Sequence, residues 1–299
     1  MAETVSGVSA GANAPGFDRL GWVALIIGTA IIAWSGIIAR FLDVGPVAGA
    51  AWRMGLAVPA LALWARLAWR RSPALGEAAP FAAPLILAGL AFAADVGSFH
   101  IALTGTKVAN ATFIGNVAPI LAVVGGAVFF RERPPPRVWF ALAVALFGSW
   151  VMAGMLAPAR LGFGDLFALG AATAYASYLL VVKSLRRSLD GPTVTLWSAA
   201  VSAIALAVAA SLRGEVLIPH SVVGWATVLL LGIVSHALGQ GLTSVAIGRL
   251  PVGPLALVIL VQPPFSALIA YLVLGENMSP LQMVGGVIIL AAVAAARPR

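Results

Sequence analysis

The sequence contains no cysteine and few charged residues, since only 9% of its 299 residues are Asp, Glu, Lys or Arg. The missing cysteine excludes a disulfide framework, iron–sulfur ligation and thiol catalysis. The three histidines, His100, His220 and His236, have no metal-ligand spacing and no second carboxylate nearby. No glycine-rich loop precedes a Lys and a Ser or Thr, as ATP binding would require. We therefore expect no metal, no cofactor and no enzymatic activity.

Long apolar stretches dominate what is present. Hydrophobic residues make up 61% of the chain, and its mean hydropathy of +1.03 exceeds that of soluble domains. A bilayer core needs about 20 apolar residues per helix. Stretches of that length, continuously apolar and without strand-like alternation, fall at 20–39, 46–65, 80–103, 107–130, 137–156, 163–182, 192–212, 222–246, 252–274 and 280–296. The sequence predicts an all-α membrane protein with ten transmembrane helices.

The basic residues divide unevenly between the two ends of these helices. Arg40, Lys107, Arg160 and Arg213 fall on one side and Arg53 lies inside the second span, whereas all other Lys and Arg residues fall on the opposite side. Because Lys and Arg accumulate on the cytoplasmic side, both termini are predicted to be cytoplasmic in the inner (plasma) membrane. Residues 1–19 are predicted to form a flexible cytoplasmic tail. The net charge of +8 is spread over short loops, which argues against a nucleic-acid partner.

A repeat appears when the sequence is shifted by 144 positions. The shift aligns a mid-helix proline, a glutamate at the helix exit and a proline opening the next helix: Pro119 with Pro263, Glu132 with Glu276, and Pro136 with Pro280. The repeats, 20–156 and 163–296, each contain five predicted spans. Since five is odd, the two halves are predicted to have opposite orientations in the membrane, as in many secondary transporters.

These motifs resemble those of the EamA-type ten-helix members of the drug/metabolite transporter superfamily. The resemblance covers essentially the whole chain and rests on Trp34-Ser35-Gly36, Pro46, Trp52-Arg53, Pro119 to Glu132, Pro263, Gly275-Glu276, Pro280 and Gly285-Gly286. It implies a secondary transporter that exports amino acids or related metabolites by alternating access, and it favours the aromatic amino acid exporter branch. The first copy departs from the family pattern, because Arg131 replaces the glycine expected before Glu132 and three prolines follow at 134–136.

Asp95, near the middle of the third span, is the strongest candidate for a substrate-binding residue. An ionised carboxylate in the bilayer costs at least ~2.5 kcal/mol, so it should face a cavity or a partner. It could bind a substrate ammonium group or carry a proton, and the alternative is a structural ion pair. We expect Arg53 to snorkel outward or to pair with an outer acid, and Glu132 and Glu276 to cap helices or form pairs.

Further candidates are polar or aromatic residues in the predicted spans. Aromatic rings suit aromatic or amphipathic substrates, and mid-span polar groups can bind substrate or neighbouring helices. The predicted substrate-binding residues beside Asp95 are Trp34, His100, Asn110, Asn116, Tyr175, Tyr178, His236, Gln240 and Gln262. Pro119, Pro263 and Pro264 are predicted to kink helices that line the cavity, although kinks can also serve packing alone. The expected partners are a small-molecule substrate, membrane lipid and a proton if Asp95 titrates, and one chain has enough helices to act as a monomer.

Other functions remain open from the sequence. The protein could export nucleobases or cationic compounds, or it could sense a ligand without transporting it. An intramembrane aspartyl protease is suggested by Gly162-Phe163-Gly164-Asp165 and by Pro59-Ala60-Leu61. The predicted positions disfavour it, because Asp165 lies at a helix entrance whereas Asp95 is buried in the membrane.

Overall fold

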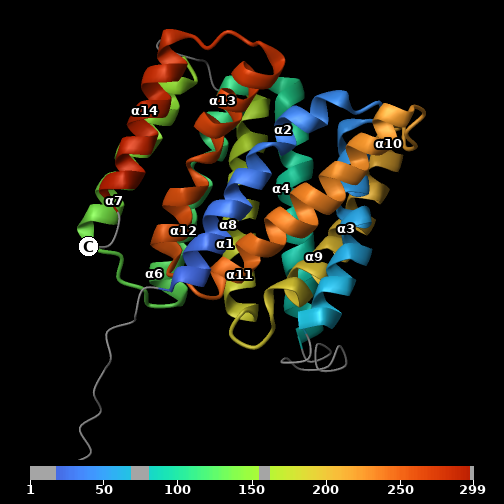
Figure 1. The fold of residues 1–299 in the computed structure, drawn as a ribbon, viewed down its shortest axis with the longest axis horizontal. Coiled ribbons are helices and arrows are strands. Elements are labelled where there is room, and N and C mark those ends of the chain that lie inside the picture. Colours follow the sequence, from blue (N-terminus) through green and yellow to red (C-terminus); the bar gives the residue numbers. More distant parts are fainter. Residues whose placement is uncertain (1–17, 69–80, 155–161, 297–299) are drawn as a thin grey trace, which may run out of the picture.

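The computed structural model describes residues 18–68, 81–154 and 162–296, and within these ranges the chain is helical without strands. The helices form one bundle, whose long elements run side by side (Figure 1). This confirms the all-α prediction. Residues 1–17 of the tail predicted at 1–19 lie outside the described ranges. The last two residues of that prediction belong to the first helix, which begins at Arg19 and is capped by the Asp18 carboxylate, which accepts from Gly21 N at 2.8 Å.

The predicted spans are helical in both halves. The first half comprises α1 (Arg19–Ala33), α2 (Ser35–Ile38), η1 (Ala39–Phe41), α3 (Pro46–Ala68), α4 (Ala82–Gly105), α5 (Val108–Gly115), α6 (Ala118–Phe129) and α7 (Pro136–Met152). The second comprises α8 (Phe163–Leu185), α9 (Gly191–Leu212), α10 (Val222–Leu229), η4 (Leu230–Gln240), α11 (Gly241–Ile247), α12 (Val252–Ile259), α13 (Gln262–Leu274) and α14 (Pro280–Ala295). Among the described residues, eight spans are long and apolar enough to cross a bilayer, and α7 and α14 are shorter apolar helices.

The prolines of the repeat interrupt one helix in each half. α5 ends at Gly115 and α6 begins at Ala118, so Pro119 stands in the first turn of the new helix, where its missing N–H costs nothing. In the second half, α12 ends at Ile259 and α13 begins at Gln262. Pro263 therefore takes the same position as Pro119. Where kinks were predicted, both helices end and restart in matching register.

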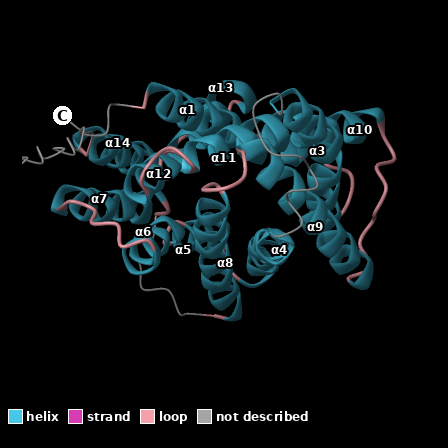
Figure 2. Ribbon diagram, turned by 90° about the horizontal axis from the view of Figure 1, so that it is seen from below, coloured by secondary structure: helices cyan, strands magenta, loops and turns pink. Residues whose placement is uncertain are grey.

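The two halves interlock instead of forming separate bundles. α4 packs against α8, α3 against α9 and α7 against α14, so each of these pairs joins one helix from each half (Figures 1 and 2). The interior of the bundle is consequently shared by both repeats. Any site there is built from both halves of the sequence.

The α7–α14 contact depends on glycines that let the two backbones approach. A Cβ added to Gly285 would lie 2.4 Å from Met152 N and 2.5 Å from Gly148 O. We expect Gly285→Ala to lower the melting temperature in detergent, because backbone must move and such overpacking costs about 1–3 kcal/mol. Gly170→Ala is the matched control, because nothing lies within 4 Å of its added Cβ. Equal melting temperatures for the two variants would contradict the prediction.

Arg131, the residue that departs from the family pattern, adopts a left-handed backbone. Its φ is +54°, and Gly275, its counterpart under the 144-residue shift, has φ +66°. A side chain in this conformation costs roughly 1 kcal/mol. We therefore expect Arg131→Gly to stabilise the protein by about 1 kcal/mol, measured as a rise in melting temperature. Arg133→Gly, which changes the same residue type without a positive φ, should not reproduce the rise.

Candidate functional site

Two residues of opposite charge lie in the interior of the bundle, Asp95 on α4 and Arg53 on α3. Both are half-buried, and Arg53 is the charged group that acts electrostatically on Asp95. They form no salt bridge within 4.0 Å, and the Nε of Arg53 is buried without a hydrogen-bond partner. The prediction that Arg53 snorkels outward or pairs with an outer acid was wrong, because Arg53 interacts with a carboxylate inside the bundle.

Aromatic side chains of α4 and α8 lie beside this charged pair. Tyr175 and Tyr178 on α8 stack with their ring centroids 6.1 Å apart, and Asp95 and Arg53 both act electrostatically on Tyr175. The Phe92 ring, one turn before Asp95 on α4, lies 4.7 Å from Tyr178 and 6.4 Å from Tyr175. The two tyrosines predicted from the sequence are therefore brought together with Asp95, and Phe92 was not predicted.

The segment η4 lies beside these residues of α3, α4 and α8, and it is π-helical over 11 residues. π-Helical segments occur often at functional sites, because the wider turn redirects side chains. His236 is 1% exposed, lies 5.5 Å from the Phe92 ring, and has no hydrogen-bond partner for either ring nitrogen. Gln240 donates from Nε2 to the Tyr178 hydroxyl at 3.2 Å. The predicted pair His236 and Gln240 thus belongs to the same cluster as Asp95.

The interior cluster is defined by seven residues from four segments: Arg53, Phe92, Asp95, Tyr175, Tyr178, His236 and Gln240. It combines one cation, one anion and three aromatic rings within a membrane-embedded bundle. Charges held at this depth must face each other, water or a ligand. The cluster therefore offers both charged groups and aromatic rings, which match a small molecule with charged and apolar parts.

Several predicted residues make contacts with their own helix or with another part of the bundle. Asn116 donates to the Ser149 hydroxyl on α7 at 3.3 Å, Asn110 donates to Thr106 at 3.3 Å, and His100 Nδ1 lies 2.7 Å from the Val96 carbonyl. These three residues therefore make the helix-packing contacts that were the alternative to substrate binding.

Trp34 and the residues at the break between α12 and α13 take no part in the contacts of Asn116, Asn110 and His100. Trp34 is 43% exposed at the junction of α1 and α2. Gln262 and Pro263 are half-buried at the start of α13, and Pro264 is buried. Their proposed role in lining a pathway stays a prediction.

The structure accounts for Asp165 without proteolysis. Its carboxylate accepts a hydrogen bond from Gly162 N at 2.8 Å and one from the Thr106 hydroxyl at 2.7 Å, which caps the start of α8. Asp165 thus has a structural role at a helix terminus. Within the described ranges, no three His, Cys, Asp or Glu residues gather in a way that could hold a metal ion.

A cavity of about 530 Å³ lies elsewhere, between α1, α12, α13 and α14. Its walls are apolar apart from Thr29, and it contains no charged side chain. Such a cavity offers no partner for a charged substrate. We therefore place the candidate site at the interior cluster instead.

The two glutamates related by the repeat form ion pairs at opposite ends of the bundle. At one end, which we call the Glu132 face, Glu132 pairs with Lys183 at 3.0 Å and accepts from Val252 N at 2.8 Å. At the other, the Glu276 face, Glu276 pairs with Arg40. The expected pairing of both glutamates is confirmed. The Glu132 and Lys183 side chains are only 19% and 15% exposed, against 42% and 56% for Glu276 and Arg40.

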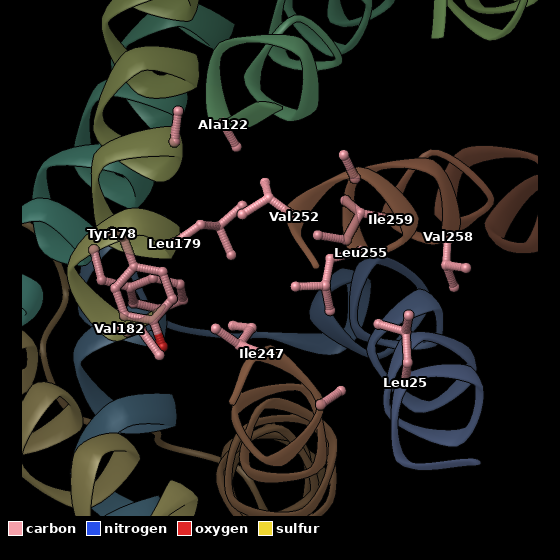
Figure 3. Close-up of a cluster of buried hydrophobic side chains, with 14 of the residues drawn as sticks. Leu25, Ala122, Tyr178, Leu179, Val182, Ile247, Val252, Leu255, Val258 and Ile259 are labelled. Carbon is pink, nitrogen blue, oxygen red and sulfur yellow. The ribbon is translucent and has the colours of Figure 1, made fainter. Parts of the chain in front are cut away.

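An apolar layer separates the interior cluster from the Glu132 face. Figure 3 shows Val182 beside Tyr178 on α8, with Ile247 of α11 and Leu255 of α12 in the same apolar cluster. Val182, Ile247 and Leu255 are 0%, 1% and 3% exposed. Together with the half-buried Glu132–Lys183 pair, they fill the bundle at the Glu132 face.

Comparison with known proteins agrees with this architecture. The model of the EamA-like transporter family matches residues 19–154 and again 162–296. The chain is 28% identical to a probable terminal-alkyne amino-acid exporter of Streptantibioticus cattleyicolor, over 73% of this chain and 75% of that protein. It is also 28% identical to the threonine/homoserine exporter RhtA of Escherichia coli K12, over 70% of this chain and 69% of that one.

A solved crystal structure has a similar fold. It superposes with a TM-score of 0.74 at 22% sequence identity, covering 92% of this chain and 96% of the other. The two family matches correspond to the two five-span halves, and together they include every helix described above. This chain therefore belongs to the EamA-like transporter family and is a multi-pass membrane transporter of the exporter type.

Proposed function

We propose that the protein is a secondary transporter that exports amino acids, aromatic or otherwise amphipathic, out of the cytoplasm. The observation that carries the proposal is the half-buried Asp95 beside stacked Tyr175 and Tyr178 in the membrane interior. A carboxylate there can bind the ammonium group that all amino acids share. The rings offer stacking and cation–π contacts to the apolar part of the substrate.

The relatives support amino acids as the substrate class. Two of them are named as exporters of amino acids, one of threonine and homoserine and one of a terminal-alkyne amino acid. The side chains of these substrates differ, whereas the ammonium and carboxylate groups are the same. A conserved mode of binding would therefore act on the charged groups, which is the role proposed for the interior cluster.

The proposed mechanism is alternating access, in which the two halves rock about a substrate bound at the interior cluster. Inverted repeats make inward-open and outward-open states similar in energy, because each half can take the other's conformation. The positive-inside rule assigns the Glu132 face, with Arg131 and Arg133, to the cytoplasm. On this assignment the structure is closed on the cytoplasmic side, and both termini are cytoplasmic.

Efflux from liposomes tests the proposed function. Purified protein is reconstituted with labelled amino acids, nucleobases, sugars and cationic compounds inside, and release is measured with and without a proton gradient. Release of amino acids above that of protein-free liposomes is the expected result. Release restricted to nucleobases or cations would favour the second exporter class, and binding without release would favour a sensor.

A further inference from the structure

The inference begins with Arg53, whose guanidinium has a buried N–H donor without a partner. A guanidinium carries five N–H donors, and burying any one of these donors without an acceptor is costly. Arg53 Nε is buried with no hydrogen-bond partner, and its interaction with Asp95 is longer than a salt bridge. Two opposite charges are thus held in the same interior without neutralising each other directly. This is the arrangement expected of a site that is completed by a ligand with charges of both signs.

His236, on the η4 segment that packs against α3, provides a second unpaired polar group, and the charge of Arg53 acts on it. The η4 segment packs tightly on α3 at this level, since a Cβ on Gly232 would lie 3.2 Å from Arg53 O and 2.7 Å from Leu56 Cβ. His236 follows Gly232 by one turn and experiences the charge of Arg53. Both of its ring nitrogens are buried and without partners. A neutral imidazole offers one N–H donor, so Arg53 and His236 can donate together to one acceptor group.

We infer that Arg53 and His236 bind the carboxylate of an α-amino acid whose ammonium group lies against Asp95. This assignment rests on the proposed function and narrows its substrate to zwitterions. Arg suits a carboxylate because its planar fork donates two parallel hydrogen bonds. The substrate side chain then lies among Phe92, Tyr175 and Tyr178.

The arrangement selects against substrates that carry only one charge. An amine without a carboxylate would neutralise Asp95 but leave Arg53 and His236 unpaired beside a bound cation. A carboxylic acid without an ammonium group would leave Asp95 unpaired beside an anion. Unpaired buried polar groups are the most effective basis for rejecting analogues, because their desolvation is not compensated.

Matched ligands test the assignment on the purified full-length protein. Binding is measured for phenylalanine, phenylethylamine and 3-phenylpropionate, and for threonine, 1-amino-2-propanol and 3-hydroxybutyrate. Wild-type protein is expected to bind at least one of the two amino acids at least tenfold more tightly than either of its single-charge analogues. In Arg53→Gln, the preference for that amino acid over the matching amine should fall by at least tenfold, while its preference over the acid is retained.

Two further variants keep the result interpretable. Arg53→Lys retains the charge without the fork and should recover part of the preference, even if Arg53→Gln lowers expression. Ser177→Ala, an exposed position on α8 whose hydroxyl bonds only to Thr173 O of its own helix, should bind like wild type. If wild-type protein bound the amine as tightly as the amino acid, the assignment of Arg53 and His236 would be overturned, but the proposed function would not. If the protein neither bound nor exported any amino acid, both this assignment and the proposed function would be overturned.

Discussion

Replacing Asp95 by Asn is expected to lower amino-acid efflux at least tenfold. The substitution keeps the size of the side chain and removes the negative charge proposed to bind the substrate ammonium group. Hydrogen bonds to charged groups contribute about 1.5–3 kcal/mol, and each 1.4 kcal/mol is a factor of about ten in affinity. The residual efflux should also lose any dependence on a proton gradient, because an amide cannot take up the proton that a carboxylate carries. Both quantities are measured in the liposome assay.

Asp18→Asn is the matched control for this experiment. Asp18 is the same residue type, but it caps α1 at the end of the bundle and pairs with Arg249 at 3.0 Å. Its carboxylate lies outside the membrane-spanning part, so efflux should stay near the wild-type rate. Wild-type efflux in Asp95→Asn, with the variant folded by gel filtration and melting temperature, would remove Asp95 from the substrate site.

Breaking the Glu132–Lys183 pair is expected to open the Glu132 face. The Lys183 ammonium bonds to Glu132 and donates to Leu250 O at 2.8 Å, so it ties α8 to the two segments that close this end. Removing one partner of a fully buried pair costs about 3–5 kcal/mol, and less for a partly exposed one. A loss of about 1.4 kcal/mol from the closed state would raise the population of the open state tenfold.

The absence of native cysteine makes this opening measurable with one introduced thiol. Val182→Cys places a thiol in the apolar layer, where the native side chain is fully buried. Lys183→Ala in this background should increase the rate of maleimide labelling at least tenfold. Arg40→Ala breaks the ion pair of Glu276, the repeat counterpart of Glu132, and is the matched control. This variant should not accelerate labelling. Loss of the Arg40 pair favours opening of the Glu276 face, and in alternating access the Glu132 face is then closed. Equal acceleration by both variants would show general loosening and contradict a gate at either end.

Sequence patterns were sufficient for the architecture and for part of the site. Each apolar span became a helix because a bilayer leaves no other way to satisfy backbone hydrogen bonds within one segment. Pro119 and Pro263 broke their helices in matching register, since a missing N–H acts locally and independently of the fold. Asp95 stood out because a charge in the middle of an apolar span has few explanations.

Arg53 and Phe92 show what could not be predicted from the sequence. Arg53 carries the same intramembrane signal as Asp95, but its position within its span also allows snorkelling, and only the fold shows which way it turns. Phe92 is one of 13 phenylalanines in an apolar chain, so its residue type carries no information about the site.

The sequence by itself determined that this protein lies in a membrane, has two repeated halves and keeps a carboxylate in its interior. Those properties depend on residue type and spacing along one helix. Only the tertiary structure decided that Arg53, Asp95, His236 and the two tyrosines share one cluster, and that Glu132 pairs with Lys183. The physical reason is that contacts between helices depend on how the two halves interlock. Hydrophobicity does not encode that packing, because lipid is as apolar as the helix surfaces that could pack together.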